Sequence, residues 1–141
     1  GLEGRPVVEV FDVQQQEWSV LEHVKGLKRT AFPSVGALQG RILVLDNCSK
    51  GFFMFNPSQP EAGWVAAASP THHERQACGV AVYGDRFVVG GGRNSGGGRS
   101  VEAFRFTAGV EAEEWWAGEW EAWPDLKIDR VGPALAVVQG R

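Results

Sequence analysis

The sequence predicts an all-β protein that is built from repeats of a four-stranded unit. Glycine supplies 19 of the 141 residues, about twice its usual share, whereas methionine and tyrosine occur once each. Six tryptophans and eight phenylalanines are spread among these glycines. A turn-dense chain with many glycines and aromatic residues is typical of short strands rather than of long helices. The third observation is an internal repeat, in which four kinds of marker recur in the same order.

The repeat is marked by residues at regular spacings. The arginines lie 46 and 55 residues apart, and each precedes a small, apolar run: Arg29, Arg75 and Arg130. A tryptophan lies 10 or 11 residues before each arginine: Trp18, Trp64 and Trp120. The phenylalanines of the pattern are 44 and 49 residues apart: Phe11, Phe55 and Phe104. Because these markers keep one order, we expect one structural unit for each repeat.

Each unit is expected to hold four short strands. The first strand is the small, apolar run, at 33–39, 77–83 and 132–138. A glycine turn, at Gly40 or Gly84, separates it from the second strand, at 41–46 and 86–91. The third strand has the pattern Val-Glu-x-Phe or a variant of it, at 7–12, 52–56 and 100–106. The fourth strand holds the tryptophan, at 17–21, 63–67 and roughly 114–120.

The apolar pattern also predicts how these strands are buried. The first and second strands are almost continuously apolar, so we expect them to be buried on both faces, with Tyr83 inside. Small residues such as Gly36 and Gly79 suit a place where a neighbouring sheet approaches closely. The third strand alternates, which predicts that Glu9 and Glu102 lie on a half-exposed face.

The ordered set of markers resembles the kelch repeat of β-propellers, the family that includes galactose oxidase. The second unit matches that pattern best, because the doublet Gly90-Gly91 follows its second strand. The first unit has Leu45-Asp46 where the doublet belongs. The resemblance covers roughly residues 7–141 and implies an arc of a kelch-type β-propeller. Two complete four-stranded antiparallel blades, at 29–67 and 75–120, would be flanked by partial blades at 7–21 and 130–141.

An arc of this size predicts a need for additional blades. A propeller usually closes its ring with about four to eight blades, and a single sheet cannot bury both of its faces. We therefore expect further blades of a larger protein, or self-association of this chain, to complete the ring. The sequence begins at Gly1 rather than at a methionine, which we interpret as the start of a fragment or a processed piece.

Charge and composition exclude several classes of partner. The net charge is −3, so the basic surplus that a nucleic-acid binder needs is missing. No stretch approaches about 18 consecutive apolar residues, so we expect no membrane span. Cys48 and Cys78 are too few for a disulfide framework, which favours a reducing compartment, the cytoplasm with the nucleus as the alternative.

The resemblance implies that partners bind at one edge of the blades. Loops that join the second to the third strand, or the fourth strand to the next unit, emerge together at that edge, here called the loop face. We expect the partner-binding residues to be Asn47, Lys50, His72, His73, Arg93, Asn94, Arg99, Lys127 and Arg130. Most lysines and arginines of this acidic chain would gather there, which predicts acidic or polar partner segments. Ordinary solvated loops are the alternative.

Other motifs favour structural roles. The segment 90–99 lacks the Gly-Lys-Ser/Thr ending of a phosphate-binding loop, so we expect a connecting loop. His72 and His73 are adjacent and have no evident third ligand, so no metal site is predicted. The three regularly placed arginines fit a structural role between blades better than the binding of a ligand carboxylate. The tryptophans of 111–123 suit packing on the neighbouring blade or, as the alternative, an exposed hot spot.

These observations favour a protein-interaction module over an enzyme. Kelch proteins often serve as substrate-recognition parts of ubiquitin ligases, so the resemblance implies that setting for this chain. A propeller enzyme such as the copper-dependent galactose oxidase is one alternative. Its chemistry uses two tyrosines, whereas this chain has only Tyr83, so we expect no cofactor and no catalytic residues. Carbohydrate binding through stacked tryptophans is the other alternative.

Overall fold

The computed structural model describes residues 8–21, 33–46, 51–70, 75, 77–93, 98–130 and 132–138. Within these residues lie ten strands and one short 3-10 helix. The elements are β1 (Val8–Asp12), β2 (Glu17–Leu21), β3 (Ser34–Leu38), β4 (Arg41–Leu45), β5 (Phe52–Phe55), η1 (Pro60–Ala62), β6 (Trp64–Ala66), β7 (Gly79–Tyr83), β8 (Arg86–Gly90), β9 (Val101–Phe106) and β10 (Gly118–Trp123).

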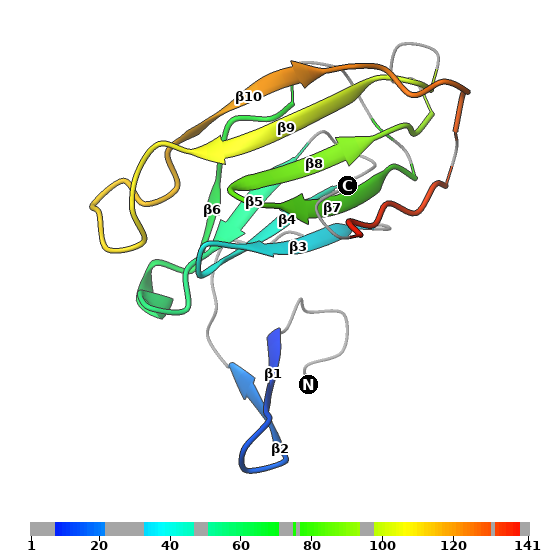
Figure 1. Ribbon diagram of the computed structural model, residues 1–141. Coiled ribbons are helices and arrows are strands. Elements are labelled where there is room, and N and C mark those ends of the chain that lie inside the picture. Colours follow the sequence, from blue (N-terminus) through cyan, green and yellow to red (C-terminus); the bar gives the residue numbers. More distant parts are fainter. Residues whose placement is uncertain are drawn as a thin grey trace.

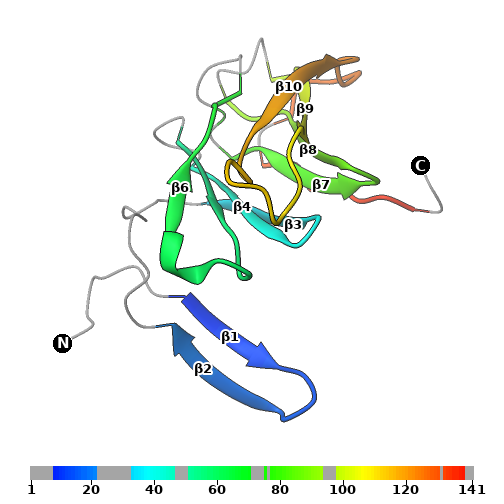
Figure 2. The same cartoon turned by 90° about the vertical axis from the view of Figure 1, so that its left-hand side faces the viewer.

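The strands form three antiparallel sheets in sequence order. Blade 1 has the order β3-β4-β5-β6, and blade 2 has the order β7-β8-β9-β10. The strands β1 and β2 form a separate two-stranded sheet, called here the N-terminal hairpin, which projects away from the blades in Figures 1 and 2. The fold is all-β and forms an arc of a β-propeller, in which two complete blades follow the partial one formed by the hairpin.

The register confirms the repeat that the sequence predicted. In each sheet, the phenylalanine of the third-type strand lies directly opposite the tryptophan of the fourth. The three pairs are Phe11 with Trp18, Phe55 with Trp64 and Phe104 with Trp120. Cross-strand aromatic pairs of this kind stabilise a sheet and help to set its register. The hairpin therefore corresponds to the outer two strands of a blade.

Blades 1 and 2 share one hydrophobic core. Leu43, Leu45, Phe52 and Met54 of blade 1 are buried with four side chains of blade 2. Those four are Phe87, Val89, Phe104 and Phe106. The Phe52 ring lies 5.2 Å from that of Phe104, edge to face, which is a favourable aromatic arrangement. Burying one face of each sheet against the other is what makes the pair of blades stable.

A close approach of strands explains the small residue at Gly36. The edge strands β3 and β7 contact one another across the two blades. A Cβ atom built on Gly36 would lie 2.7 Å from Cε2 of Phe87, which is too close for any side chain. The expectation that small residues of the first strand allow a neighbouring sheet to approach is confirmed here.

The first strands are not buried on both faces, contrary to the prediction. In β3, Val35 is exposed, and in β7 the side chain of Tyr83 is 46% exposed. Each of these strands lies at the edge of its sheet and has a single strand neighbour. An apolar run therefore indicated a strand correctly, but it did not distinguish an edge strand from a central one.

Glu102 does not lie on a half-exposed face as predicted. Its exposed fraction is 0%, and the guanidinium of Arg75 pairs with its carboxylate at 2.8 Å. Glu9, the corresponding residue of β1, is exposed. The alternation of β9 was read correctly, but Glu102 shares its face with Phe104 and Phe106, which pack in the core between the blades, and Arg75 supplies its counter-charge there.

For two segments the structure differs from the strands that the sequence predicted. The fourth strand of blade 2 is β10, at Gly118–Trp123 rather than 114–120, because 107–117 forms the preceding loop. Residues 132–138, called here the C-terminal segment, form no strand. No second strand pairs with this segment in the part of the chain that the structure describes. It still packs on blade 2, since Leu135 lies over Gly79 and Gly90.

Candidate partner-binding loop face

Two loops of blade 2 are joined by main-chain hydrogen bonds at one edge of the sheet. The loop between β8 and β9 and the stretch after β10 both lie at the right-hand edge of Figure 1. Leu126 N donates to Arg99 O at 2.7 Å, and Arg130 N donates to Gly98 O at 2.9 Å. Gly92 N donates to Arg130 O at 2.8 Å. These bonds hold the described parts of the two loops as one surface.

Gly91 shows why a glycine doublet follows β8. Its backbone φ is +70°, a conformation that residues other than glycine rarely adopt. A Cβ atom there would also lie 2.9 Å from the carbonyl oxygen of Arg130. The second glycine of the doublet therefore permits the close approach of the two loops.

Arg75 holds the loop between β8 and β9 against the sheet. It is buried, and its Nη1 donates to the carbonyl oxygens of Gly91 and Ser100 at 3.1 and 2.7 Å. Its Nη2 donates to Ser100 Oγ at 2.5 Å and to Glu102 Oε2 at 2.8 Å. These partners all belong to blade 2, and through Gly91 and Ser100 the arginine joins both ends of one loop.

Four of the predicted binding residues lie on this surface, and all four are exposed: Arg93, Arg99, Lys127 and Arg130. The described parts of the two loops carry two carboxylates, Asp125 and Asp129. Arg99 Nε lies 3.7 Å from Asp129 Oδ1, but both side chains are largely in solvent, where such a pair contributes little. The surface therefore keeps a net positive charge.

Sequence reasoning missed one residue of this surface. Ile128 lies between Lys127 and Asp129, and its side chain is 60% exposed. An apolar side chain in the middle of a charged loop was the available signal. It gives the loop face an apolar contact point that the charged residues surround.

The remaining predicted residues fall outside the described part of the chain. These are the loop residues Asn47, Lys50, His72, His73 and Asn94, together with Arg29 of the repeat. Gly40 and Gly84 occupy the predicted hairpin turns, with φ of +77° and +56°. Gly90 ends β8 and is buried.

The tryptophans near β10 mostly face the protein interior. Trp115 is fully buried in the shared core, and Trp120 packs on Phe52 with ring centroids 5.0 Å apart. Trp120 Nε1 also donates to Ala68 O of the preceding blade at 2.7 Å. Because these two indoles fill the space between the blades, they present no flat surface for a sugar to stack on.

Other chemistry finds little support among the described residues. No group of three or more His, Cys, Asp or Glu side chains in those ranges is arranged to hold a metal ion. Cys78 is buried, and its burial raises the pKa of its thiol above the ordinary value. Such a thiol is a poor nucleophile. In the described ranges, no helix has the length and apolar character that a membrane crossing needs.

Comparisons with known proteins show similarity at the level of fold. No family model matches the chain, and no curated protein matches it. The solved structure described as "Structure of YjhT", a β-propeller-like fold, is similar to this chain with a TM-score of 0.63 and 13% sequence identity. The match covers 86% of this chain and 44% of that one, so the chain spans less than half the length of its structural neighbour. By its fold, the chain is thus similar to part of a β-propeller.

Proposed function

We propose that this chain is a protein-interaction module that binds an acidic or polar segment of a partner protein through its loop face. The observation that carries the proposal is the cluster of four exposed cations on two loops that are hydrogen-bonded to each other. Cations that lack strong internal partners are available to a ligand, and complementary charge speeds association and sets orientation.

The fixed backbone of the surface supports binding rather than mere solvation. Arg75 and the three loop-to-loop hydrogen bonds hold the described loop residues in place before any partner arrives. A preformed surface loses less conformational entropy when it binds. Ile128 supplies an apolar contact at its centre, which favours a partner segment that combines acidic residues with one apolar side chain.

The kelch resemblance of the repeat supports a wider setting for this role. We infer that the module serves as the substrate-recognition part of a larger assembly such as a ubiquitin ligase. We place it in the cytoplasm or nucleus, where the thiol of Cys78 stays reduced.

The binding proposal is tested with synthetic peptides of constant length and rising glutamate content, each carrying one leucine. Binding is measured by fluorescence polarisation at several salt concentrations. We expect affinity to rise with glutamate content and to fall with salt. Replacing Arg93, Arg99, Lys127 and Arg130 together by alanine should weaken binding about tenfold or more.

The matched control is Arg105→Ala, which removes an exposed arginine from β9 instead of from the loop face. It should leave peptide affinity unchanged. Equal binding by the fourfold variant and the unaltered chain would exclude the loop face as the binding site. Affinity that is independent of glutamate content would exclude an acidic partner segment.

A further inference from the structure

The N-terminal hairpin exposes a face that is covered in both blades. Phe11 and Trp18 lie opposite one another, and Val20 belongs to the same face because strand side chains alternate. The side chain of Trp18 is 68% exposed, and Phe11 and Val20 are also exposed. The opposite face of the hairpin is the one that contacts blade 1, through Val8. The face with Trp18 therefore has no sheet against it among the described residues.

In blade 2 the corresponding face rests on the preceding blade. Phe104 and Trp120 occupy the positions of Phe11 and Trp18, and both pack on Phe52 of blade 1, with ring centroids 5.2 and 5.0 Å apart. A hairpin with this pattern is thus built to lie on the far face of another blade.

The open face of blade 2 is such a surface. It is the sheet face opposite blade 1, and it is formed by Val88, Val101, Ala103 and Trp123 with Leu126 beside them. An apolar hollow of about 250 Å³ lies there, between β7, β8, Trp123 and the C-terminal segment. Leu135 of that segment already occupies part of this face, as the first strand of a following blade would.

Two arginines at equivalent positions have different surroundings in the described structure. Arg41 is the first residue of β4 and Arg86 is the first residue of β8, and each follows a glycine turn. Arg41 pairs with Leu38 at the end of β3, and Arg86 pairs with Tyr83 at the end of β7. Arg41 is buried and crosses to blade 2, where its Nη1 donates to Ala108 O and Trp115 O, both at 2.8 Å. Its guanidinium also lies 3.5 Å from the ring centroid of Phe106.

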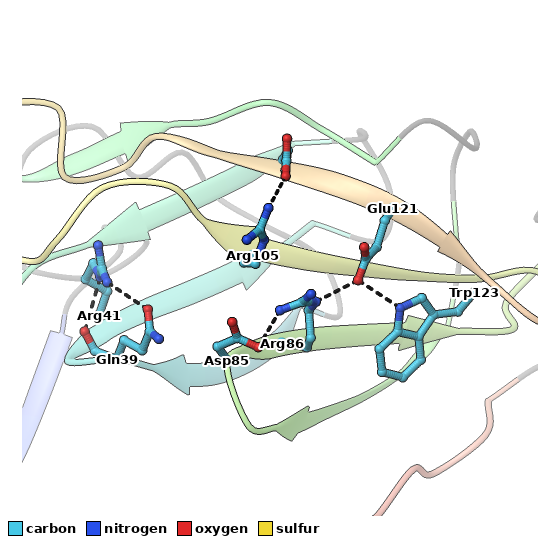
Figure 3. A network of polar contacts seen from close by, with 8 residues as sticks. Gln39, Arg41, Asp85, Arg86, Arg105, Glu121 and Trp123 are labelled. Carbon is cyan, nitrogen blue, oxygen red and sulfur yellow. Dashed lines mark hydrogen bonds and ion pairs between the residues drawn. The ribbon is translucent and has the colours of Figure 1, made fainter.

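Arg86 makes no such crossing. In Figure 3 it lies between Asp85 and Glu121 of its own blade, and its Nε donates to Glu121 Oε1 at 2.6 Å. It projects from the open face, as Arg41 projects from the face of blade 1 that blade 2 covers. We infer that both arginines have the same role and that Arg86 would donate to an element laid on the open face.

We propose that copies of this chain join head to tail, so that the N-terminal hairpin of one copy lies on the open face of blade 2 of another. Trp18 then packs on Val101 and Trp123 in the way that Trp120 packs on Phe52. Arg86 donates to carbonyl oxygens of the turn at 13–16. The inference continues the interface between blades 1 and 2 and is independent of the function proposed for the loop face. Because the two contacting surfaces differ, such a contact produces rings or chains of copies.

The test uses the full chain and two variants, one for each surface. Trp18→Asp places a charge on the hairpin, and Trp123→Asp places one on the open face. Analytical ultracentrifugation should show concentration-dependent association of the unaltered chain and a monomer for each variant alone. An equal mixture of the two variants should form a dimer, because one variant keeps an intact hairpin and the other keeps an intact open face.

Several results would overturn the proposal. These are an unaltered chain that stays monomeric, a mixture that stays monomeric, and a Trp123→Asp variant that still associates by itself.

Arg86→Ala is a second variant on the open face, and it should weaken association about tenfold through the lost hydrogen bonds. Near-ultraviolet circular dichroism of the buried Trp115 reports whether each variant keeps its core. Ile128→Asp, on the loop face, is the matched control and should associate normally.

Discussion

Glu102 shows how a single residue can be misjudged from its neighbours in the sequence. It lies in an alternating strand, yet it is buried and forms its ion pair with Arg75 in the interior of blade 2. Removing one partner of a buried pair leaves an uncompensated charge, which is far more costly than the pair itself is stabilising. The Arg75 side chain also holds both ends of the loop between β8 and β9, so its charge partner affects the loop face as well.

We predict that Glu102→Gln lowers the free energy of unfolding by about 3–5 kcal/mol, because the buried guanidinium loses its counter-charge. Urea denaturation, followed by tryptophan fluorescence, measures this difference. The double variant Arg75→Met with Glu102→Leu is the control, and it should lose less stability than the single variant since no charge remains buried. A single variant as stable as the unaltered chain would contradict the role of the ion pair.

Cys78 makes stability depend on pH at the alkaline end. Burial raises the pKa of its thiol, so the folded chain holds this proton more tightly than the unfolded chain does. The contribution is complete below the ordinary thiol pKa and is lost as pH rises through the raised value. Above about pH 8.5, the ordinary thiol pKa, stability should therefore fall more steeply in Cys48→Ser than in Cys48→Ser with Cys78→Ala. Parallel pH profiles from urea denaturation would contradict this.

At the scale of elements, the same strand pair occurs in three environments. The tryptophan of the fourth-type strand is 68% exposed at Trp18 but only 8% exposed at Trp64. Trp64 packs on Phe55 within the sheet and belongs to a small apolar cluster with Val44. The local sequence pattern therefore predicts the strand pair. The presence of a neighbouring sheet decides how much the tryptophan contributes to the stability of the fold.

We predict that Trp64→Ala lowers the free energy of unfolding by about 3–5 kcal/mol, because it leaves a cavity in a packed cluster. Trp18→Ala, the same substitution at the matching position, should change it by about 0.5 kcal/mol or less, as is usual at an exposed site. Both values come from urea denaturation at low protein concentration, where association does not contribute. Similar losses from the two variants would show that the hairpin is packed in solution.

At the scale of the whole molecule, the two blades are joined by polar contacts as well as by their core. Arg41 of blade 1 donates to two carbonyl oxygens in the loop between β9 and β10, and Asn56 Nδ2 donates to Val110 O of the same loop at 2.8 Å. Burial lowers the pKa of the Arg41 guanidinium, yet the carbonyl oxygens and the Phe106 ring compensate its charge. These bonds hold the loop of one blade against the turns of the other.

We predict that Arg41→Met destabilises the chain by about 1–3 kcal/mol for each buried carbonyl that loses its donor. Arg86→Met, at the equivalent position of blade 2, should leave the free energy of unfolding nearly unchanged at low protein concentration, because its partners are exposed. Urea denaturation of the two variants side by side measures the difference. A large loss for Arg86→Met would show that the two arginines are not equivalent in the way described.

The sequence by itself determined the strands, their order and the edge at which the loops emerge. These properties depend on local patterns: glycine turns at Gly40 and Gly84, alternating side chains, and the recurring pair of phenylalanine and tryptophan. The antiparallel direction of successive strands then places the loops that carry Arg93, Arg99, Lys127 and Arg130 at one edge without any knowledge of packing. The start of β10 could not be predicted from the sequence, because no local pattern distinguishes Trp115 in the loop from Trp120 in the strand.

Only the tertiary structure decided which residues are buried and which contacts carry stability. Glu102 is buried because its face of β9, with Phe104 and Phe106, packs toward blade 1, and Arg41 is buried because a loop of the next blade covers it. Residues 132–138 have the pattern of a strand, but a strand needs a second strand for its ladder of main-chain hydrogen bonds, and none pairs with this segment in the described structure. Such outcomes depend on segments distant in the sequence, since burial and pairing are properties of the neighbours a residue acquires on folding.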